Sequence, residues 1–369
     1  MPSPSPRSVL LLGSNTVGGG AERFVTDFAQ LLATHGDLPH LATLFACEPV
    51  SDAYPTISLG HDNVFSSWRT VQRLGKLIDQ HRFDIVISNG RYTGQFAAAA
   101  LRKRQSRWIS RIGSPYQNAR GGIKEHLGRR YFQRVSRRAD AFVCNSHGLS
   151  EDLLLTLPNA RPVTIPNCIA SHLESGACPT ATPGSREHLD VLWAGRFVPG
   201  KAPLEALEAL SIVARDTPVR ATFCGDGPLK DEILAKANHV DGMEVEVLPW
   251  QDDLPARMRQ SDLFLFSSHW EGMPNVLLEA GACGLPCVAT DCDFGPREII
   301  TAETGCLVDV GDIAAMAESI SRLLNNQGLL ADMGKAARAH VLANHSSTAI
   351  WPLWDSLLCS QTSAQTSTP

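Results

Sequence analysis

The chain repeats one pattern of hydrophobic and polar positions at two places that lie far apart in the sequence. Each copy has a short apolar run, then a glycine-containing loop, then apolar positions at helical spacing, such as Phe24, Phe28, Leu31 and Leu32. A strand, a glycine loop and a helix in this order open a doubly wound α/β domain. The predicted elements are a strand, a loop and a helix at residues 8–12, 13–20 and 21–35, and again at 191–194, 195–201 and 204–214.

Further apolar runs extend this alternation through both halves of the chain. Short continuous apolar runs are typical of parallel strands that are buried on both faces. The expected fold class is therefore α/β, with two Rossmann-like doubly wound domains facing across a cleft and the ligand at the carboxyl ends of the strands. These runs predict strands at residues 84–88 and 141–145, and at 219–224, 245–248, 263–266, 287–290 and 305–308.

Composition marks the boundaries of the domains. Residues 171–188 contain Pro179, Pro183, Gly184 and several small polar residues, which is typical of a linker. Towards the C-terminus, apolar residues from Ile350 to Leu358 fall on one helical stripe, and the Ser, Thr and Gln after them indicate disorder. The predicted parts are a first domain at 7–170, the linker at 171–188, a second domain at 189–345, a helix at 346–359 and a disordered tail at 360–369.

Bulk composition excludes several classes of protein. Among the 369 residues no apolar run reaches the ~20 residues that span a bilayer. The Pro- and Ser-rich start lacks the apolar stretch of a signal peptide and predicts a disordered leader. Ten cysteines never form Cys-x2-Cys, which argues against a zinc site and indicates buried thiols in a reducing cytoplasm.

The net charge of −5 hides a basic stretch at residues 102–138, which holds twelve Lys and Arg against one acid, Glu125. Trp108, Tyr116, Tyr131 and Phe132 are interleaved with these cations. Such a stretch predicts peripheral contact with an anionic membrane. The alternative is a solvated helix face, and nucleic-acid binding is not favoured because no known motif accompanies the charge.

Two glutamates form the strongest candidate site. Glu271 and Glu279 have seven residues between them and flank Gly272, Met273, Pro274, Asn275 and Val276. Pro274 suits the first turn of a helix, whose free N–H groups make a ready anion site. Carboxylates beside such amides suit a polyhydroxylated ligand that carries phosphate. The alternative is that Glu271 caps a helix and Glu279 lies on a solvated face.

This segment resembles the Glu-x7-Glu signature of retaining glycosyltransferases of family 4, which have the GT-B fold. The resemblance implies that Glu271 contacts the donor sugar, that Glu279 contacts the ribose of the nucleotide, and that residues 272–276 line the donor site. It also implies a first domain that binds the acceptor, a second that binds the nucleotide sugar, and a C-terminal helix that crosses back to the first domain.

Two loops add candidate phosphate contacts. Arg196 and Lys201 are cations on one loop, where they can neutralise a diphosphate, and Gly195-Arg196-x4-Lys201 matches the phosphate-binding pair of the family. Gly19 and Gly20 match its Gly-Gly-x-Glu loop, in which glycine lets the backbone approach the donor phosphate. The alternatives are an ordinary surface loop and a structural glycine turn. Neither loop is a Walker or dinucleotide-binding motif.

The first domain offers weaker signals. Many family members carry a His near the end of a first-domain strand, but the corresponding segments here contain none. Arg91, Arg111 and Ser114 are the candidates for acceptor contacts.

In the second domain, Gly225 and Gly227 are interpreted as a structural turn, and Asp291 and Asp293 are rejected as a metal site.

Together these features predict a retaining hexosyltransferase. It would move a hexose or N-acetylhexosamine from a nucleotide sugar, with UDP favoured, to a glycan or polyprenyl-linked acceptor in cell-surface polysaccharide synthesis. We expect no metal, no cofactor and no nucleic-acid partner, and a cytoplasmic location at the inner face of the membrane. Glu271, Arg196 and Lys201 would be catalytic. The alternatives are a nucleotide-sugar 2-epimerase of the same fold and a non-catalytic sugar-nucleotide-binding subunit.

Overall fold

The chain forms two compact units. The computed structural model describes residues 5–16, 19–47, 50–61, 66–115, 123–175, 188–237, 242–251 and 253–360. One unit comprises Met1–Asn167 with Ile350–Pro369, and the other comprises Cys168–Ala349. The stretch predicted as a linker begins with the short helix α6 (Ser171–Glu174), and most of its remainder lies outside the described residues. The predicted leader and tail lie largely outside them as well.

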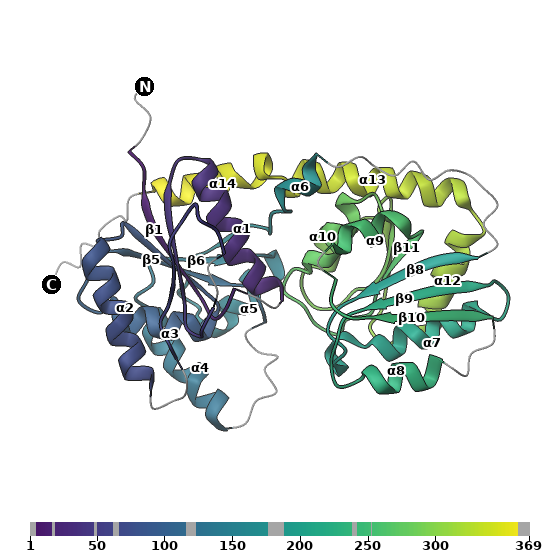
Figure 1. The fold of residues 1–369 in the computed structure, drawn as a ribbon, viewed down its shortest axis with the longest axis horizontal. Helices are drawn as coiled ribbons and strands as arrows, with labels where there is room; N and C mark the ends of the chain where they lie inside the picture. Colours follow the sequence, from purple (N-terminus) through teal and green to yellow (C-terminus); the bar gives the residue numbers. More distant parts are fainter. Residues whose placement is uncertain are drawn as a thin grey trace. The chain divides into compact units, whose positions relative to one another are not determined.

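A parallel seven-stranded sheet forms the centre of the first unit (Figure 1). Its order is β3-β2-β1-β4-β5-β6-β7. The order in which strands are added to the sheet therefore reverses between β1 and β4, as in a doubly wound fold. The strands are β1 (Ser8–Gly13), β2 (Leu38–Thr43), β3 (Thr56–Ser58), β4 (Ile85–Asn89), β5 (Arg107–Ile112), β6 (Ala141–Cys144) and β7 (Pro162–Thr164).

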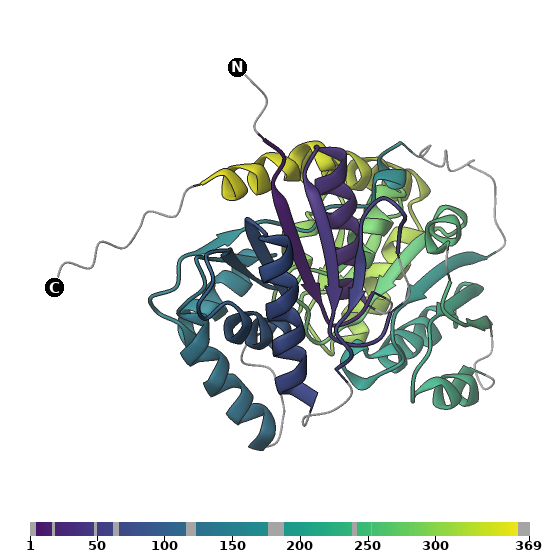
Figure 2. The same cartoon turned by 60° about the vertical axis from the view of Figure 1, so that its left-hand side comes forward.

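Helices cover both faces of this sheet. In Figure 1, α2, α3 and α4 lie side by side on one face, and α1 lies on the other. The turned view in Figure 2 shows the yellow α14 beside the purple α1. The helices are α1 (Gly20–Thr34), α2 (Ser67–His81), α3 (Arg91–Ala100), α4 (Ile123–Ser136), α5 (His147–Thr156) and α14 (Ser347–Cys359).

The C-terminal helix α14 ends in the first unit, as predicted. The Trp354 ring lies 4.3 Å from that of Phe28, centroid to centroid. Arg7 of the leader pairs with Asp355 at 2.8 Å, and Arg107 Nη1 donates to the Leu357 carbonyl at 2.7 Å. The last turn is thus held by packing, by an ion pair and by a cation on a C-terminal carbonyl, which the helix dipole favours.

A parallel six-stranded sheet forms the centre of the second unit, in the order β10-β9-β8-β11-β12-β13. The strands are β8 (Leu189–Ala194), β9 (Val219–Cys224), β10 (Met243–Leu248), β11 (Leu263–Phe266), β12 (Cys287–Thr290) and β13 (Gly305–Val308). The helical elements are α7 (Pro203–Val213), α8 (Lys230–Ala237), α9 (Leu254–Gln260), α10 (Asn275–Ala282), α11 (Pro296–Ile299), α12 (Ile313–Leu324), α13 (Gln327–His345) and the 3-10 turn η2 (Pro199–Lys201).

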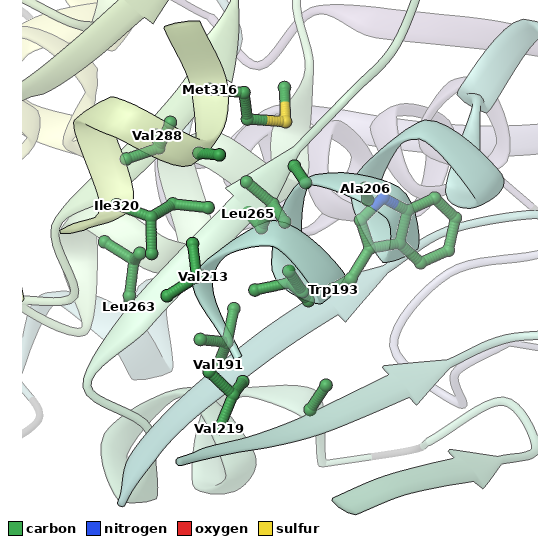
Figure 3. Close-up of a cluster of buried hydrophobic side chains, with 14 of the residues drawn as sticks. Val191, Trp193, Ala206, Val213, Val219, Leu263, Leu265, Val288, Met316 and Ile320 are labelled. Carbon is green, nitrogen blue, oxygen red and sulfur yellow. The ribbon is translucent and has the colours of Figure 1, made fainter. Parts of the chain in front are cut away.

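Strand alternation gives the second unit a core on each face of its sheet. Val191, Trp193 and Leu265 pack with Ala206 of α7 and Ile320 of α12 (Figure 3). The residues between them on the same strands face the opposite layer, around α10 and α13. Both faces are apolar because helices cover both, which explains the continuous apolar runs. No helix in the described part of the chain is long and apolar enough to cross a membrane.

Candidate functional site

The candidate site is built on the carboxyl edge of the second sheet. Because all its strands are parallel, the loops that follow them meet at one edge. The loop after β8 carries Arg196 and Lys201, and the loop after β11 carries Glu271. Two further loops, after β9 and β12, pack against these two.

Lys201 and Glu271 form an ion pair that joins two of these loops. The Lys201 ammonium donates to the Glu271 carboxylate, and their side chains are 25% and 14% exposed. Arg196 is exposed on the same loop, and the described residues offer it no acidic partner. An anion arriving here therefore meets one available guanidinium and one ammonium that is already held by a carboxylate.

Backbone contacts hold the loop of Lys201 in a strained conformation. Ala202 has φ +46°, a left-handed conformation that costs a non-glycine residue about 1–2 kcal/mol. The Ser267 hydroxyl lies 2.9 Å from the carbonyl oxygens of Lys201 and Ala202, and the His269 N–H donates to the Gly200 carbonyl at 2.9 Å. Strain that neighbouring groups maintain in this way is typical of a functional loop.

Trp270 covers the glycine that precedes Lys201. A Cβ on Gly200 would lie 2.4 Å from the Trp270 ring, so only glycine lets the indole approach this closely. The adjacent His269 ring lies 2.8 Å from a carboxylate oxygen of Glu205 on α7. These contacts fix the chain on the N-terminal side of Glu271.

Helix α10 begins one residue later than predicted. Pro274 has φ −76° and ψ 106°, which makes it the residue that caps the helix and not its first helical residue. In the first turn the Leu277 N–H donates to the Pro274 carbonyl at 3.1 Å, so anion binding at this helix start stays a prediction. Glu279 lies in the next turn and is only 9% exposed, which rules out the alternative of a solvated face residue.

The loop after β12 presses on the Glu271 loop from the other side. Gly295 has φ +94°, and a Cβ there would lie 2.8 Å from the Gly272 carbonyl oxygen and 2.8 Å from Pro274 Cδ. Trp270 pairs with Asp293 in a parallel bridge, and the Glu271 N–H faces the Asp293 carbonyl at 3.4 Å. Asp293 thus supports the loop through its backbone.

Gly225 and Gly227 act on the loop of Arg196 in the same way. Cβ atoms on them would lie 1.9 Å from the Gly195 carbonyl oxygen and 2.6 Å from that of Phe197. This close approach accounts for their structural interpretation. Asp291 is held by the Arg297 guanidinium at 2.9 and 2.8 Å, and the described residues contain no group of three side chains that could hold a metal ion.

The glycine loop of the first unit lies at the start of α1. The Gly19 N–H donates to the Glu22 carboxylate at 3.0 Å, so this glutamate closes the N-terminus of the helix. Gly20 is the first helical residue. Gly18, which belongs to the same motif, lies outside the described residues.

The three acceptor candidates follow strands of the first sheet but differ in exposure. Arg91 begins α3 and is half-buried, while Ser114 is exposed after β5. Arg111 is only 2% exposed, and its guanidinium donates to the side-chain oxygens of Asn89 and Asn167, both at 2.7 Å. Burial lowers the pKa of Arg111 to about 9. Arg111 is therefore bonded to neutral oxygens and lacks the solvent access that a direct contact with an acceptor needs.

The aromatic residues of the basic stretch do not all face solvent, which corrects the membrane interpretation. Trp108 and Phe132 are both buried in the first unit. Trp108 lies on β5, where its indole N–H donates to the Ser88 hydroxyl at 2.9 Å. Tyr116 lies outside the described residues. On α4, in contrast, Tyr131 and Leu127 are exposed together with several arginines.

One histidine at the carboxyl edge of the first sheet escaped sequence analysis. His61 follows β3, is 3% exposed, and has its Nε2 2.7 Å from the Tyr92 hydroxyl. The strand before it has three residues and gives no hydrophobic signal. The sequence therefore carries no local signal that marks His61.

Two family models match the chain. Residues 18–172 match the model described as glycosyltransferase family 4, and residues 188–326 match the one described as glycosyl transferases group 1. The crystal structure of Anabaena Alr3699/HepE in complex with UDP and glucose has a TM-score of 0.81 and 18% identity. It covers 96% of this chain and 100% of its own, and it shows the shared fold.

Several curated relatives are named as glycosyltransferases. A lipopolysaccharide core biosynthesis glycosyltransferase of Rhizobium meliloti is 29% identical over 69% of this chain and 75% of its own length. The Escherichia coli UDP-Gal:alpha-D-GlcNAc-diphosphoundecaprenol alpha-1,3-galactosyltransferase is 29% identical over 37% of this chain. The chain spans 36% of the length of that enzyme and 16–38% of several other relatives.

Proposed function

Because the chain belongs to glycosyltransferase family 4, whose enzymes retain anomeric configuration, we propose that it transfers a hexose or N-acetylhexosamine from a UDP-sugar to a glycan or lipid-linked acceptor. The observation that carries this proposal is the Lys201–Glu271 ion pair beside the N-terminus of α10. It places a cation, a carboxylate and helix amides within one edge of the sheet. A UDP donor is supported by relatives named for UDP-galactose and for a complex with UDP.

The leaving group determines the first task of the site. As the bond between the anomeric carbon and the diphosphate oxygen breaks, negative charge grows on the diphosphate and positive charge on the sugar ring. Arg196, Lys201 and the first amides of α10 stabilise the diphosphate, and loss of one such preorganised partner costs ~3–4 kcal/mol. Lys201 exchanges its Glu271 contact for phosphate oxygens when the donor binds.

Glu271 and Glu279 then take the hydroxyl-bearing parts of the donor. Glu271, released by Lys201, accepts from sugar hydroxyls and opposes the charge on the ring. Glu279, which is buried in the second turn of α10, accepts from the ribose. Gly272, Met273, Asn275 and Val276 contribute backbone at the same turn.

The acceptor hydroxyl attacks the face that the diphosphate leaves. Its oxygen bonds to the anomeric carbon, and its proton passes to the departing phosphate oxygen, so configuration is retained without an enzymic nucleophile. Double displacement would need two carboxyl groups ~5 Å apart that flank the anomeric carbon, and the first domain offers no obvious nucleophile for it. Arg91 and Ser114 are candidates for holding the acceptor. Gly19 and Gly20 would approach the donor phosphates.

The proposal is tested by UDP release from UDP-hexoses and UDP-N-acetylhexosamines, with and without a bacterial membrane lipid extract. We expect release to need the extract and to fall at least ~100-fold in Glu271→Ala. Glu303→Ala is the matched control, since Glu303 is an exposed glutamate that follows α11 in the sequence. UDP binding without release from any donor would favour a binding subunit, and sugar conversion without acceptor would favour an epimerase.

The exposed face of α4 supports contact of the acceptor domain with an anionic membrane. Leu127 and Tyr131 are 59% and 46% exposed, Arg130 and Arg134 of the same helix are exposed, and Arg138 is exposed two residues beyond the end of the helix. Apolar side chains amid cations are typical of a helix that lies in a membrane interface. We infer that this face brings the enzyme to lipid-linked acceptors on the cytoplasmic side.

Co-sedimentation with vesicles tests this inference. Reversal of Arg130, Arg134 and Arg138 to Glu should abolish binding to phosphatidylglycerol vesicles, since each cation near the surface contributes about 1 kcal/mol. The charge-matched control is reversal of Arg69, Arg215 and Lys236, which lie on other helices or their ends. Equal binding of the two variants would contradict the assignment to α4.

A further inference from the structure

We propose that Tyr92, held by the buried His61, is the platform on which a sugar residue of the acceptor stacks. This inference rests on the proposed function and adds the acceptor side of the site. Neither residue belongs to a motif quoted above, and they are 31 positions apart. The fold brings them together at the carboxyl edge of the first sheet.

Their position is that of a ligand site. His61 follows β3, Phe45 follows β2, and Tyr92 lies in the first turn of α3 directly after β4. In doubly wound sheets the carboxyl ends of the strands are where ligands bind. Arg91, already a candidate for acceptor contact, is the neighbour of Tyr92 in sequence.

Hydrogen bonds hold the His61 ring at both of its nitrogens. Nδ1 lies 3.3 Å from the Thr70 hydroxyl and 3.3 Å from the Ser66 hydroxyl. Nε2 lies 2.7 Å from the Tyr92 hydroxyl, which fixes the position of that hydroxyl. The Tyr92 ring meets the Phe96 ring edge to face, with centroids 5.3 Å apart, and this packing holds its plane.

Packing holds the histidine itself in place. The His61 ring meets the Phe96 ring edge to face, with centroids 5.0 Å apart. The backbone N–H of His61 donates to the Leu44 carbonyl at 2.7 Å. Gly60 before it has φ +62°. A residue so fully constrained can hold a partner that is itself near solvent.

Tyr92 is the exposed end of this arrangement. Its side chain is 44% exposed although its hydroxyl is tied down, and Phe45, whose ring lies 5.7 Å from that of His61, is 40% exposed. Large aromatic side chains fixed at a ligand edge with a free face bind the apolar C–H face of a pyranose ring. For comparison, pairs of aromatic rings contribute ~0.5–1.5 kcal/mol beyond buried area.

The test separates acceptor binding from donor chemistry. In the lipid-extract assay, Tyr92→Ala should raise the acceptor concentration for half-maximal rate about 10-fold and leave the KM for the UDP-sugar within about 2-fold. His61→Leu and Tyr92→Phe should each raise it about 3- to 5-fold, and the double variant should be no worse than His61→Leu, because both remove one hydrogen bond. His61→Gln, whose side-chain oxygen can reach the same hydroxyl, should restore it.

Tyr54→Phe is the matched control, because its hydroxyl contacts a backbone carbonyl and not His61. Additive effects of His61→Leu and Tyr92→Phe, or an unchanged acceptor dependence in Tyr92→Ala, would overturn the proposal. A binding readout covers the case in which no transfer occurs at all. Saturation-transfer NMR with octyl glucoside should show ring-proton contacts in the wild type that vanish in Tyr92→Ala, and their persistence would equally overturn it.

Discussion

Arg111 shows how much a single side chain organises the carboxyl edge of the first sheet. Its guanidinium joins Asn89 at the end of β4 to Asn167 after β7, and it lies over the Phe24 ring at 3.6 Å. Burying a charge against neutral oxygens is costly, and the pKa lowered to about 9 expresses that cost. The two amide oxygens and the aromatic face all have this guanidinium as their partner.

Replacing Arg111 by Met should lower the free energy of unfolding of the first unit by about 2 kcal/mol, because two buried oxygens lose a donor. The pH dependence has a defined sign. The folded pKa of about 9 lies below the ordinary value of 12.5, so the unfolded chain binds more protons between these values and the wild type gains stability as pH rises. Urea titrations at about pH 8 and about pH 10.5 should therefore show a growing difference between wild type and Arg111→Met. A constant difference would contradict the burial of a charged Arg111.

The candidate residues of the second unit could be picked from the sequence because they are local, and their roles stay predictions. Glu271, Pro274 and Glu279 lie within one strand-to-helix connection, and Arg196 and Lys201 within another, so spacing alone places them at one edge. His61 and Tyr92 could not be found in this way, because only the pairing of the first sheet brings them together. Their hydrogen bond is a property of the fold and not of any segment.

At the scale of elements, buried parallel strands were the most predictable feature. The runs at 219–224, 263–266, 287–290 and 305–308 are strands with those bounds, because helices cover both faces and most of their residues are apolar and buried. Arg220 of β9 is the exposed exception among them. The strand β5 was missed because Arg107 and Arg111 occupy it. Each charge there has a structural use that periodicity does not show.

Loop contacts between elements give the next prediction. Gly295→Ala should destabilise the second unit by about 1–3 kcal/mol and lower the transfer rate by about 10- to 100-fold, because a Cβ would push the backbone at Gly272 and Pro274 and displace Glu271. Gly311→Ala is the matched control. It has φ +81° but no atom within 4 Å of the added Cβ, so it shares the backbone strain and not the clash. Equal rates in the two variants would show that the Gly295 contact does not position Glu271.

At the scale of the whole molecule, two separate cores should respond separately to substitution. Trp354 is 1% exposed and packs on Phe28 within the first unit. The chain enters that unit twice, by its beginning and by its last helix. Damage to the last helix is therefore expected to appear in the first 167 residues and to spare the second unit.

Trp354→Ala should lower the stability of the first unit by about 3–5 kcal/mol. Hydrogen exchange followed by mass spectrometry should show faster exchange in α1 and β1 and unchanged exchange in β8 and β11. The neighbouring Leu353 is 44% exposed, and Leu353→Ala should change stability by at most about 0.5 kcal/mol. Faster exchange across both units would mean that their cores are not independent.

The first unit is formed by two separate segments of the chain, and this also decides the order in which a nascent chain folds. Residues up to Asn167 leave the ribosome before the second unit, and residues from Ile350 on leave after it. The contiguous second unit can complete its core while Phe24 and Phe28 still lack Trp354. During synthesis, the amphipathic helix α1 therefore presents an uncovered aromatic surface, and it is there that a chaperone would act on this protein.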